Sequence, residues 1–161
     1  MLSRIVAALF GLLAVTTSAS AGPMTAGERQ RLIAHFEMTE AWLVSELERL
    51  SDAQLTFKMT PESWSIMEVV EHLAIAEPQY WKNLQDSLKS PVKDGFKAEA
   101  TDAAILWYGI DRTNRTTTGE ARVPHGTYPS VKESLAAFRA LRRTMLETAK
   151  TTEDDLRGRP L

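Results

Sequence analysis

The sequence contains no cysteine, which excludes disulfide bonds, thiolate nucleophiles and cysteine-ligated zinc. It also has no cluster of basic residues, and its formal net charge is −2, so nucleic acid is not the expected partner. Strand patterns, internal repeats and low-complexity tracts are absent as well. A chain of 161 residues with these properties suits one soluble domain, in which any metal ligands must be His, Asp or Glu.

Long hydrophobic runs are also lacking, because the apolar segment Ile5–Val15 is too short for a bilayer that needs about 20 residues. Arg4 precedes this segment, and a small-residue Ala-Ser-Ala sequence follows it and ends at Ala21. This order is typical of a signal peptide, residues 1–21, with an uncleaved N-terminal anchor as the alternative. The mature chain would then be Gly22–Leu161, periplasmic or secreted, with no stable membrane span after cleavage.

Apolar residues recur at helical spacing in three segments that are otherwise polar. These segments predict amphipathic helices over Ala26–Leu50, Ile66–Leu88 and Ser130–Lys150. Each begins with a capping-box pattern, a Ser or Thr followed three residues later by Glu. The sequence therefore predicts an all-α fold.

The middle helix carries the main candidate for a functional residue, His72. Its predicted buried stripe consists of Ile66, Val69, Leu73, Ala76, Tyr80, Leu84 and Leu88. His72 lies at the edge of that stripe, so its imidazole is expected to point toward the bundle interior.

A long, Pro- and Gly-punctuated connection, Pro91–Pro129, separates the second and third predicted helices. Connections of this length are typical of a crossover or a functional loop. Within it, only Thr101–Asp111 is predicted to form a helix turn or two. The polar part Asp111–Arg122 is interpreted as a solvated loop in preference to an anion-binding loop, and Thr151–Leu161 is polar and non-helical.

The sequence WSIMEVVEHL (Trp64–Leu73), followed by Ala76-Glu77 and Tyr80-Trp81, resembles the second-helix signature of the DinB-like superfamily. The resemblance extends over roughly Thr25–Leu156 and includes the order of the helices and the long connection. It implies a DinB-like up-down bundle of four helices with a long crossover between helices 2 and 3. Three of those long helices are present here, in a domain spanning residues 22–161.

The resemblance also implies chemistry, because many members of that superfamily bind a divalent metal, zinc or nickel, through three histidines. One histidine comes from the second helix and two come from an H-x-x-x-H pair on the fourth. Members with known activity include thiol-dependent S-transferases and a mycothiol-dependent maleylpyruvate isomerase.

Only His72 carries over from that ligand set, with Glu68 or Glu71 as a hydrogen-bonding partner behind it. No H-x-x-x-H pair occurs, and the only later histidine is His125, so the metal site is incomplete. The chain is therefore interpreted either as a shortened form without the fourth helix or as a bundle that has lost the metal. Convergence of His35, His72 and His125 is less favoured, because their spacing is not a ligand pattern.

Two hypotheses for function follow. In the first, the chain is an exported metal-dependent enzyme of the thiol transferase or hydrolase type, with His72 holding part of the metal site. In the second, it is a non-catalytic bundle that binds a small molecule or a protein partner in a cleft between helices. A missing fourth helix would leave an apolar stripe uncovered, which predicts association with a second copy of the chain, as a homo-oligomer, or with another helix.

Overall fold

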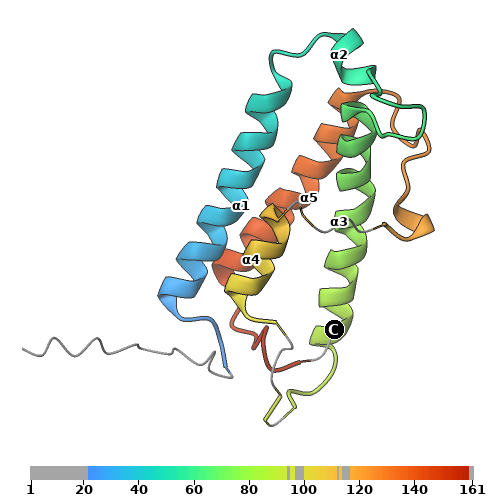
Figure 1. Ribbon diagram of the computed structural model, residues 1–161. Helices are drawn as coiled ribbons and strands as arrows, with labels where there is room; N and C mark the ends of the chain where they lie inside the picture. Colours follow the sequence, from blue (N-terminus) through green and yellow to red (C-terminus); the bar gives the residue numbers. More distant parts are fainter. Residues whose placement is uncertain (1–21, 94, 97–99, 112, 114–116, 160–161) are drawn as a thin grey trace, which may run out of the picture.

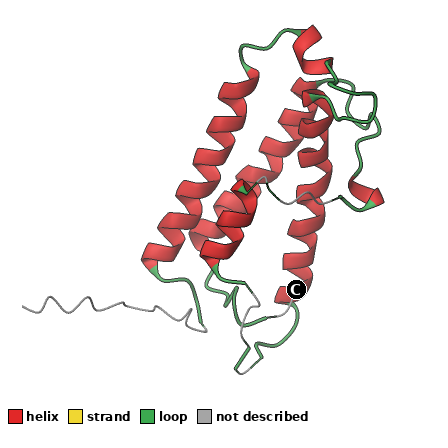
Figure 2. Cartoon of the chain, viewed as in Figure 1, coloured by secondary structure: helices red, strands yellow, loops and turns green. Residues whose placement is uncertain are grey.

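The computed structural model describes residues 22–93, 95–96, 100–111, 113 and 117–159, so the predicted signal peptide lies outside the described residues. The described residues form five α-helices and one short 3-10 helix, with no strand among them (Figure 2). The predicted all-α fold is therefore confirmed. In chain order the elements are α1 (Ala26–Leu47), α2 (Asp52–Thr56), α3 (Ile66–Leu88), α4 (Asp102–Ile110), η1 (Glu120–Arg122) and α5 (Val131–Thr151).

Three long helices, α1, α3 and α5, lie side by side and make the body of the bundle (Figure 1). α5 packs most extensively against α3 and also against α1, while the short α2 packs against α3. α1 runs opposite to α3, but α3 and α5 run in the same direction (Figure 1). The crossover between them, which contains α4 and η1, returns the chain to the end where α3 began.

Local capping explains where the long helices begin. The capping boxes predicted at Thr25 and Ser65 are both present. At Ser65, the hydroxyl accepts a hydrogen bond from the Glu68 N–H (3.2 Å), and the Glu68 carboxylate accepts one from the Ser65 N–H (2.7 Å). At Ser130 the hydroxyl accepts from the Glu133 N–H (3.2 Å) but donates to the same carboxylate (2.9 Å), so half of the predicted box forms.

α1 ends at Leu47 and not at Leu50 as predicted, because a second capping box interrupts it. Ser51 accepts from the Gln54 N–H (3.4 Å), and the Gln54 side chain accepts from the Ser51 N–H (3.0 Å). These bonds start α2 in a new direction. The short helix predicted within the crossover is confirmed as α4, capped by Thr101.

The buried face of α3 differs from the predicted stripe. The buried residues of its first half are Val70, Glu71, Ala74 and Ala76, and of these only Ala76 belongs to the predicted stripe. Ile66, Val69 and Tyr80, which the stripe included, are exposed. Apolar residues surround most of the N-terminal half of this helix, so periodicity alone did not select the face that α5 covers. In the N-terminal turns of α3 the predicted stripe therefore lies on the wrong side of the helix.

A buried ion pair joins the three long helices near their middle. The Arg142 guanidinium on α5 donates two hydrogen bonds to the Glu77 carboxylate on α3, one from Nε to Oε2 at 3.0 Å. Both side chains are largely buried, at 13% and 15% exposed. The same guanidinium lies 4.9 Å from the ring centres of Phe36 on α1 and Phe138 on α5. Burial raises the pKa of Glu77, and the hydrogen bonds from Arg142 oppose that shift.

The segment that follows α5 is packed and does not form the free polar tail that its sequence suggests. The Arg29 guanidinium donates to the Ala149 carbonyl (2.6 Å) and the Thr152 carbonyl (2.8 Å) at the end of α5. The Lys93 N–H, just after α3, donates to the Gly158 carbonyl (2.9 Å). Both ends of the described chain and the end of α3 are thereby tied together (Figure 1).

Replacing Arg142 with alanine should destabilise the fold strongly, because it leaves the Glu77 carboxylate buried without a counter-charge. We expect the free energy of unfolding to fall by about 3 kcal/mol in Arg142→Ala, measured by urea denaturation at neutral pH. The deficit should shrink as the pH falls below the raised pKa of Glu77, because the protonated acid needs no partner. Arg143→Ala, at the adjacent exposed position, is the control and should stay within about 0.5 kcal/mol of the parent. Equal losses in the two variants would contradict the role of the pair.

Candidate functional site

The three histidines lie on different parts of the molecule. His35 is exposed on α1, His72 is half-buried on α3, and His125 is exposed in the crossover. Among the described residues, no three His, Asp or Glu side chains are placed to bind one metal ion. The alternative in which the three histidines converge on a metal is therefore wrong.

The His72 ring is held against the crossover. Its Nδ1 atom lies 2.7 Å from the Arg122 carbonyl oxygen, and its ring centre is 5.1 Å from that of Trp64. A carbonyl oxygen only accepts hydrogen bonds, so Nδ1 carries the proton, and Nε2 of the neutral ring keeps its lone pair. The ring was predicted to point toward the bundle interior, but it faces η1, where it contacts the Arg122 carbonyl. This donor arrangement is typical of metal-binding histidines.

His125 is used differently, because both of its ring nitrogens have partners in the same turn. Nδ1 lies 3.0 Å from the Val123 carbonyl oxygen, and Nε2 lies 3.1 Å from the Thr127 hydroxyl. Nδ1 must donate to the carbonyl, so Nε2 accepts from the hydroxyl. The ring therefore serves the local structure of the crossover.

Glu71, the residue before His72, is a buried carboxylate that anchors the same turn. It is 3% exposed, and its Oε1 atom accepts from the His125 N–H (3.2 Å) and the Thr127 N–H (2.6 Å). Glu68 is occupied by its capping box and by Lys58 Nζ at 2.7 Å. Both glutamates expected behind His72 thus have other partners.

Arg122 links the His72 ring to Tyr80, which lies about two turns further along α3. Its carbonyl accepts from His72, while its guanidinium donates to the Tyr80 hydroxyl (2.8 Å) and lies 5.3 Å from the centre of that ring. The interpretation of Asp111–Arg122 as a solvated loop is wrong for Arg122, which is half-buried. Arg122 contacts Tyr80 across 42 positions of the chain and His72 across 50. Sequence patterns are local, so they gave no sign of these contacts.

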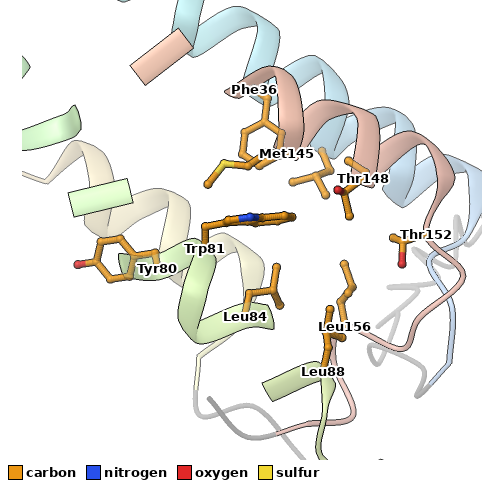
Figure 3. Close-up of a pocket in the computed structure, with 11 residues that line it drawn as sticks. Phe36, Tyr80, Trp81, Leu84, Leu88, Met145, Thr148, Thr152 and Leu156 are labelled. Carbon is orange, nitrogen blue, oxygen red and sulfur yellow. The ribbon is translucent and has the colours of Figure 1, made fainter. Parts of the chain in front are cut away.

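An apolar cavity of about 300 Å³ lies among α1, α3 and α5. Apart from two threonines and Tyr80, its walls are aliphatic, aromatic or thioether side chains. The lining consists of Leu32, Phe36, Tyr80, Trp81, Leu84, Leu88, Met145, Thr148, Ala149, Thr152 and Leu156. Figure 3 shows the Trp81 indole reaching across the cavity, with Phe36 and Met145 on one side and Leu84 on the other. Periodicity predicted some of these positions as core but gave no sign of a cavity.

The polar groups on the cavity wall already have partners. The Thr148 hydroxyl donates to the Thr144 carbonyl (3.0 Å), and the Thr152 hydroxyl donates to Asp154 (3.1 Å). The Tyr80 hydroxyl is held by Arg122, and its ring points away from the other lining residues (Figure 3). A molecule in the cavity would therefore meet mainly hydrocarbon.

The crossover helix α4 presents an apolar surface to solvent. Its large apolar side chains are all at least half exposed, namely Ile105, Leu106, Trp107, Tyr108 and Ile110. None of the described helices combines the length and the apolar composition needed to cross a membrane. α4, which carries these exposed apolar side chains, has only nine residues.

Removing the Glu71 carboxylate should release the turn that it anchors. In Glu71→Ala we expect amide hydrogen exchange at His125 and Thr127 to rise at least about tenfold, because their shared acceptor is lost. Glu71→Gln keeps an acceptor oxygen and should give a smaller rise. The Ser134 amide, which donates to the Ser130 carbonyl within α5, is the internal control and should not change. Unchanged exchange at His125 and Thr127 would argue against the anchor.

Comparison with known proteins gives one match. A family model described as the DinB superfamily matches residues 35–161, which include α2 to α5 and most of α1. No curated protein and no solved structure matches the chain. The superfamily includes metal-binding members, but the described residues of this chain offer His72 without neighbouring ligands and so do not supply a complete metal site.

Proposed function

Because this chain belongs to the DinB superfamily and has an apolar cavity between its long helices that is partly open to solvent, we propose that it binds a small apolar molecule there. The observation that carries the proposal is the cavity itself. Its volume of about 300 Å³ is at the lower end of the range of small-molecule sites, and three helices contribute to its wall. Since the hydroxyl hydrogens of Thr148 and Thr152 are already donated, the ligand is a hydrocarbon or an alkyl or aryl group, bound mainly by burial of its surface.

Filling the cavity should block this binding. Ala149 lines the cavity from α5, so Ala149→Leu places three extra carbon atoms inside it. We expect this variant to bind N-phenyl-1-naphthylamine, a neutral apolar fluorescent probe, at least about tenfold more weakly than the parent chain. Ala140→Leu makes the same change at an exposed position of α5 and should leave the affinity unchanged. The fluorescence of Trp81, which lies in the cavity, reports the binding independently.

The hydroxyl of Thr148 provides a second measurement in case Ala149→Leu folds poorly. Thr148→Val keeps the shape of the side chain and removes a group that donates within its own helix, so the probe should bind as well as before. A strong loss in this variant would instead indicate a polar ligand. In the expected homo-oligomer, a second copy of the chain would cover the apolar cavity and compete with the probe. The probe affinity should then fall as the protein concentration rises. That result would contradict the small-molecule proposal.

A second candidate is a divalent-metal protein with His72 as one ligand. The orientation of His72 favours it, because the bond from Nδ1–H to the Arg122 carbonyl leaves Nε2 as the free ligand atom. Zinc and nickel are the metals that the family resemblance implies. The remaining ligands are not among the neighbours of His72 in the described part of the chain, so no reaction step is assigned to the metal.

Metal binding can be tested on the purified protein by equilibrium dialysis against Zn²⁺ or Ni²⁺. This candidate predicts that His72→Ala lowers the metal content at least about tenfold while His35→Ala, on exposed α1, leaves it unchanged. Circular dichroism of both variants checks that the fold persists. Absence of stoichiometric metal in the parent chain, or equal metal in His72→Ala, would exclude His72 as a ligand.

Export is also part of the proposed function. The positive, apolar and small-residue order of residues 1–21 supports delivery to a periplasm or the outside of the cell. The absence of cysteine is compatible with an oxidising compartment.

A further inference from the structure

Asp155 is a buried carboxylate that belongs neither to the cavity wall nor to the surroundings of His72. It is 8% exposed and lies in the turn after α5. Its Oδ1 atom accepts from the Arg157 N–H (2.9 Å) and the Gly158 N–H (2.7 Å), which closes its own turn. Its Oδ2 atom accepts from the backbone nitrogen of Gly22 at 2.8 Å, across 133 positions of the chain.

Asp155 carries a negative charge, and neither of the arginine guanidinium groups near it forms a hydrogen bond to its carboxylate. Burial raises the pKa of Asp155, but the hydrogen bonds from Arg157, Gly158 and Gly22 together with the nearby Arg159 hold it below its usual value. The Arg157 guanidinium is engaged with Asp102 through two 2.8 Å hydrogen bonds. The Arg159 guanidinium donates to the Leu88 carbonyl at the end of α3. Asp155 is thus an ionised group in a buried turn whose nearby arginines bond elsewhere.

The Gly22 nitrogen is also the atom that signal-peptide cleavage would release. The predicted cleavage site lies between Ala21 and Gly22, a position chosen from the sequence without reference to Asp155. We propose that removal of residues 1–21 turns the Gly22 nitrogen into an α-ammonium group that pairs with buried Asp155 and locks the turn after α5 onto the start of the mature chain. The inference rests on the proposed export but not on the cavity or on a metal.

The covalent step is an ordinary amide hydrolysis by a signal peptidase of the exporting cell. One water molecule is consumed, the C–N bond between Ala21 and Gly22 breaks, and the products are a carboxylate on Ala21 and an ammonium on Gly22. No other reactant is needed. Cleavage therefore converts a neutral N–H donor that lies 2.8 Å from Asp155 Oδ2 into a cationic donor.

The backbone at Gly22 suits a new terminus. Its φ angle is +134°, a conformation that residues with side chains rarely adopt, and a side chain there would meet open space. Glycine adopts this angle at no steric cost, and once Gly22 is the first residue no preceding carbonyl defines it. Cleavage therefore strengthens the bond to Asp155 without requiring a strained backbone.

The pairing would stabilise more than the terminus, because the Asp155 turn is tightly built. A Cβ atom added at Gly158 would lie 2.4 Å from Asp155 Oδ2 and 2.8 Å from Val92 Cγ1, so the turn is pressed against the segment after α3. Leu156, inside the same turn, lines the cavity. Pairing of the new terminus with Asp155 would therefore also stabilise the contacts of this turn with the segment after α3 and with the cavity wall.

The test begins with the intact mass of the protein exported from cells that express the full chain, which should start at Gly22. The pairing itself is measured on chain released from a fusion by a site-specific protease that leaves Gly22 first. Acetylation of this terminus is the matched control, since it keeps an N–H donor and removes the charge. We expect the α-amine pKa, measured by NMR, to be raised by about one unit or more above its ordinary value near 8.

The sign of the pH dependence follows from that shift. A raised pKa in the folded state adds stability that is fully present below about pH 8 and is lost as the pH rises through the raised value. At about pH 6 the free amine should therefore have an unfolding equilibrium constant about tenfold lower than the acetylated chain. In Asp155→Asn, acetylation should make no difference.

Two results would overturn the inference. One is an exported chain that begins at a residue other than Gly22, or that keeps residues 1–21; only a chain that stays inside the cell would also remove the export proposal. The other is an α-amine of ordinary pKa whose acetylation leaves the unfolding equilibrium unchanged. Because the amine pKa is measured in the parent sequence, this second result is decisive even if Asp155→Asn fails to fold. Binding of the apolar probe is independent of both results.

Discussion

The buried pair between Glu77 and Arg142 constrains the arrangement of the whole bundle. Separating a carboxylate and a guanidinium in a largely buried site would leave each charge buried without a partner, so the pair tolerates few relative positions of the helices. Because Arg142 also lies between the rings of Phe36 and Phe138, the pair sets the register of α1, α3 and α5 together. The apolar cavity lies on the side of this pair toward the C-terminal ends of α3 and α5, where the walls are apolar and no second buried ion pair is seen among the described residues.

α3 therefore has two faces with different tasks. One face supplies Trp81, Leu84 and Leu88 to the cavity. The other holds the crossover through buried Glu71 and through the ring of His72. Both faces meet at Tyr80 and Trp81, which are adjacent in sequence and diverge in space (Figure 3). An apolar ligand beside Trp81 would meet the crossover contacts only at Tyr80, which both lines the cavity and bonds to Arg122, whereas His72 is not part of the cavity wall.

The parts of this structure that follow from short-range patterns were predictable, and the parts that depend on distant partners were not. Hydroxyl caps and apolar periodicity identified the three long helices, and the WSIMEVVEHL signature identified the superfamily. The face of α3 was misplaced because apolar residues occur on most of its circumference. The roles of Arg122 and Asp155 depend on residues 42 to 133 positions away, which local patterns do not record. His72 was identified, but its neighbours became apparent only in three dimensions.

Each of the five α-helices in the described chain begins at a serine or threonine whose hydroxyl accepts a backbone N–H, at Thr25, Ser51, Ser65, Thr101 and Ser130. These starting points are encoded within four residues and do not depend on which side chains fill the interior. Interior positions can therefore change during evolution while the ends of the elements stay in place. Substitutions on the walls of the apolar cavity would therefore change its shape without moving the points at which α1, α3 and α5 begin.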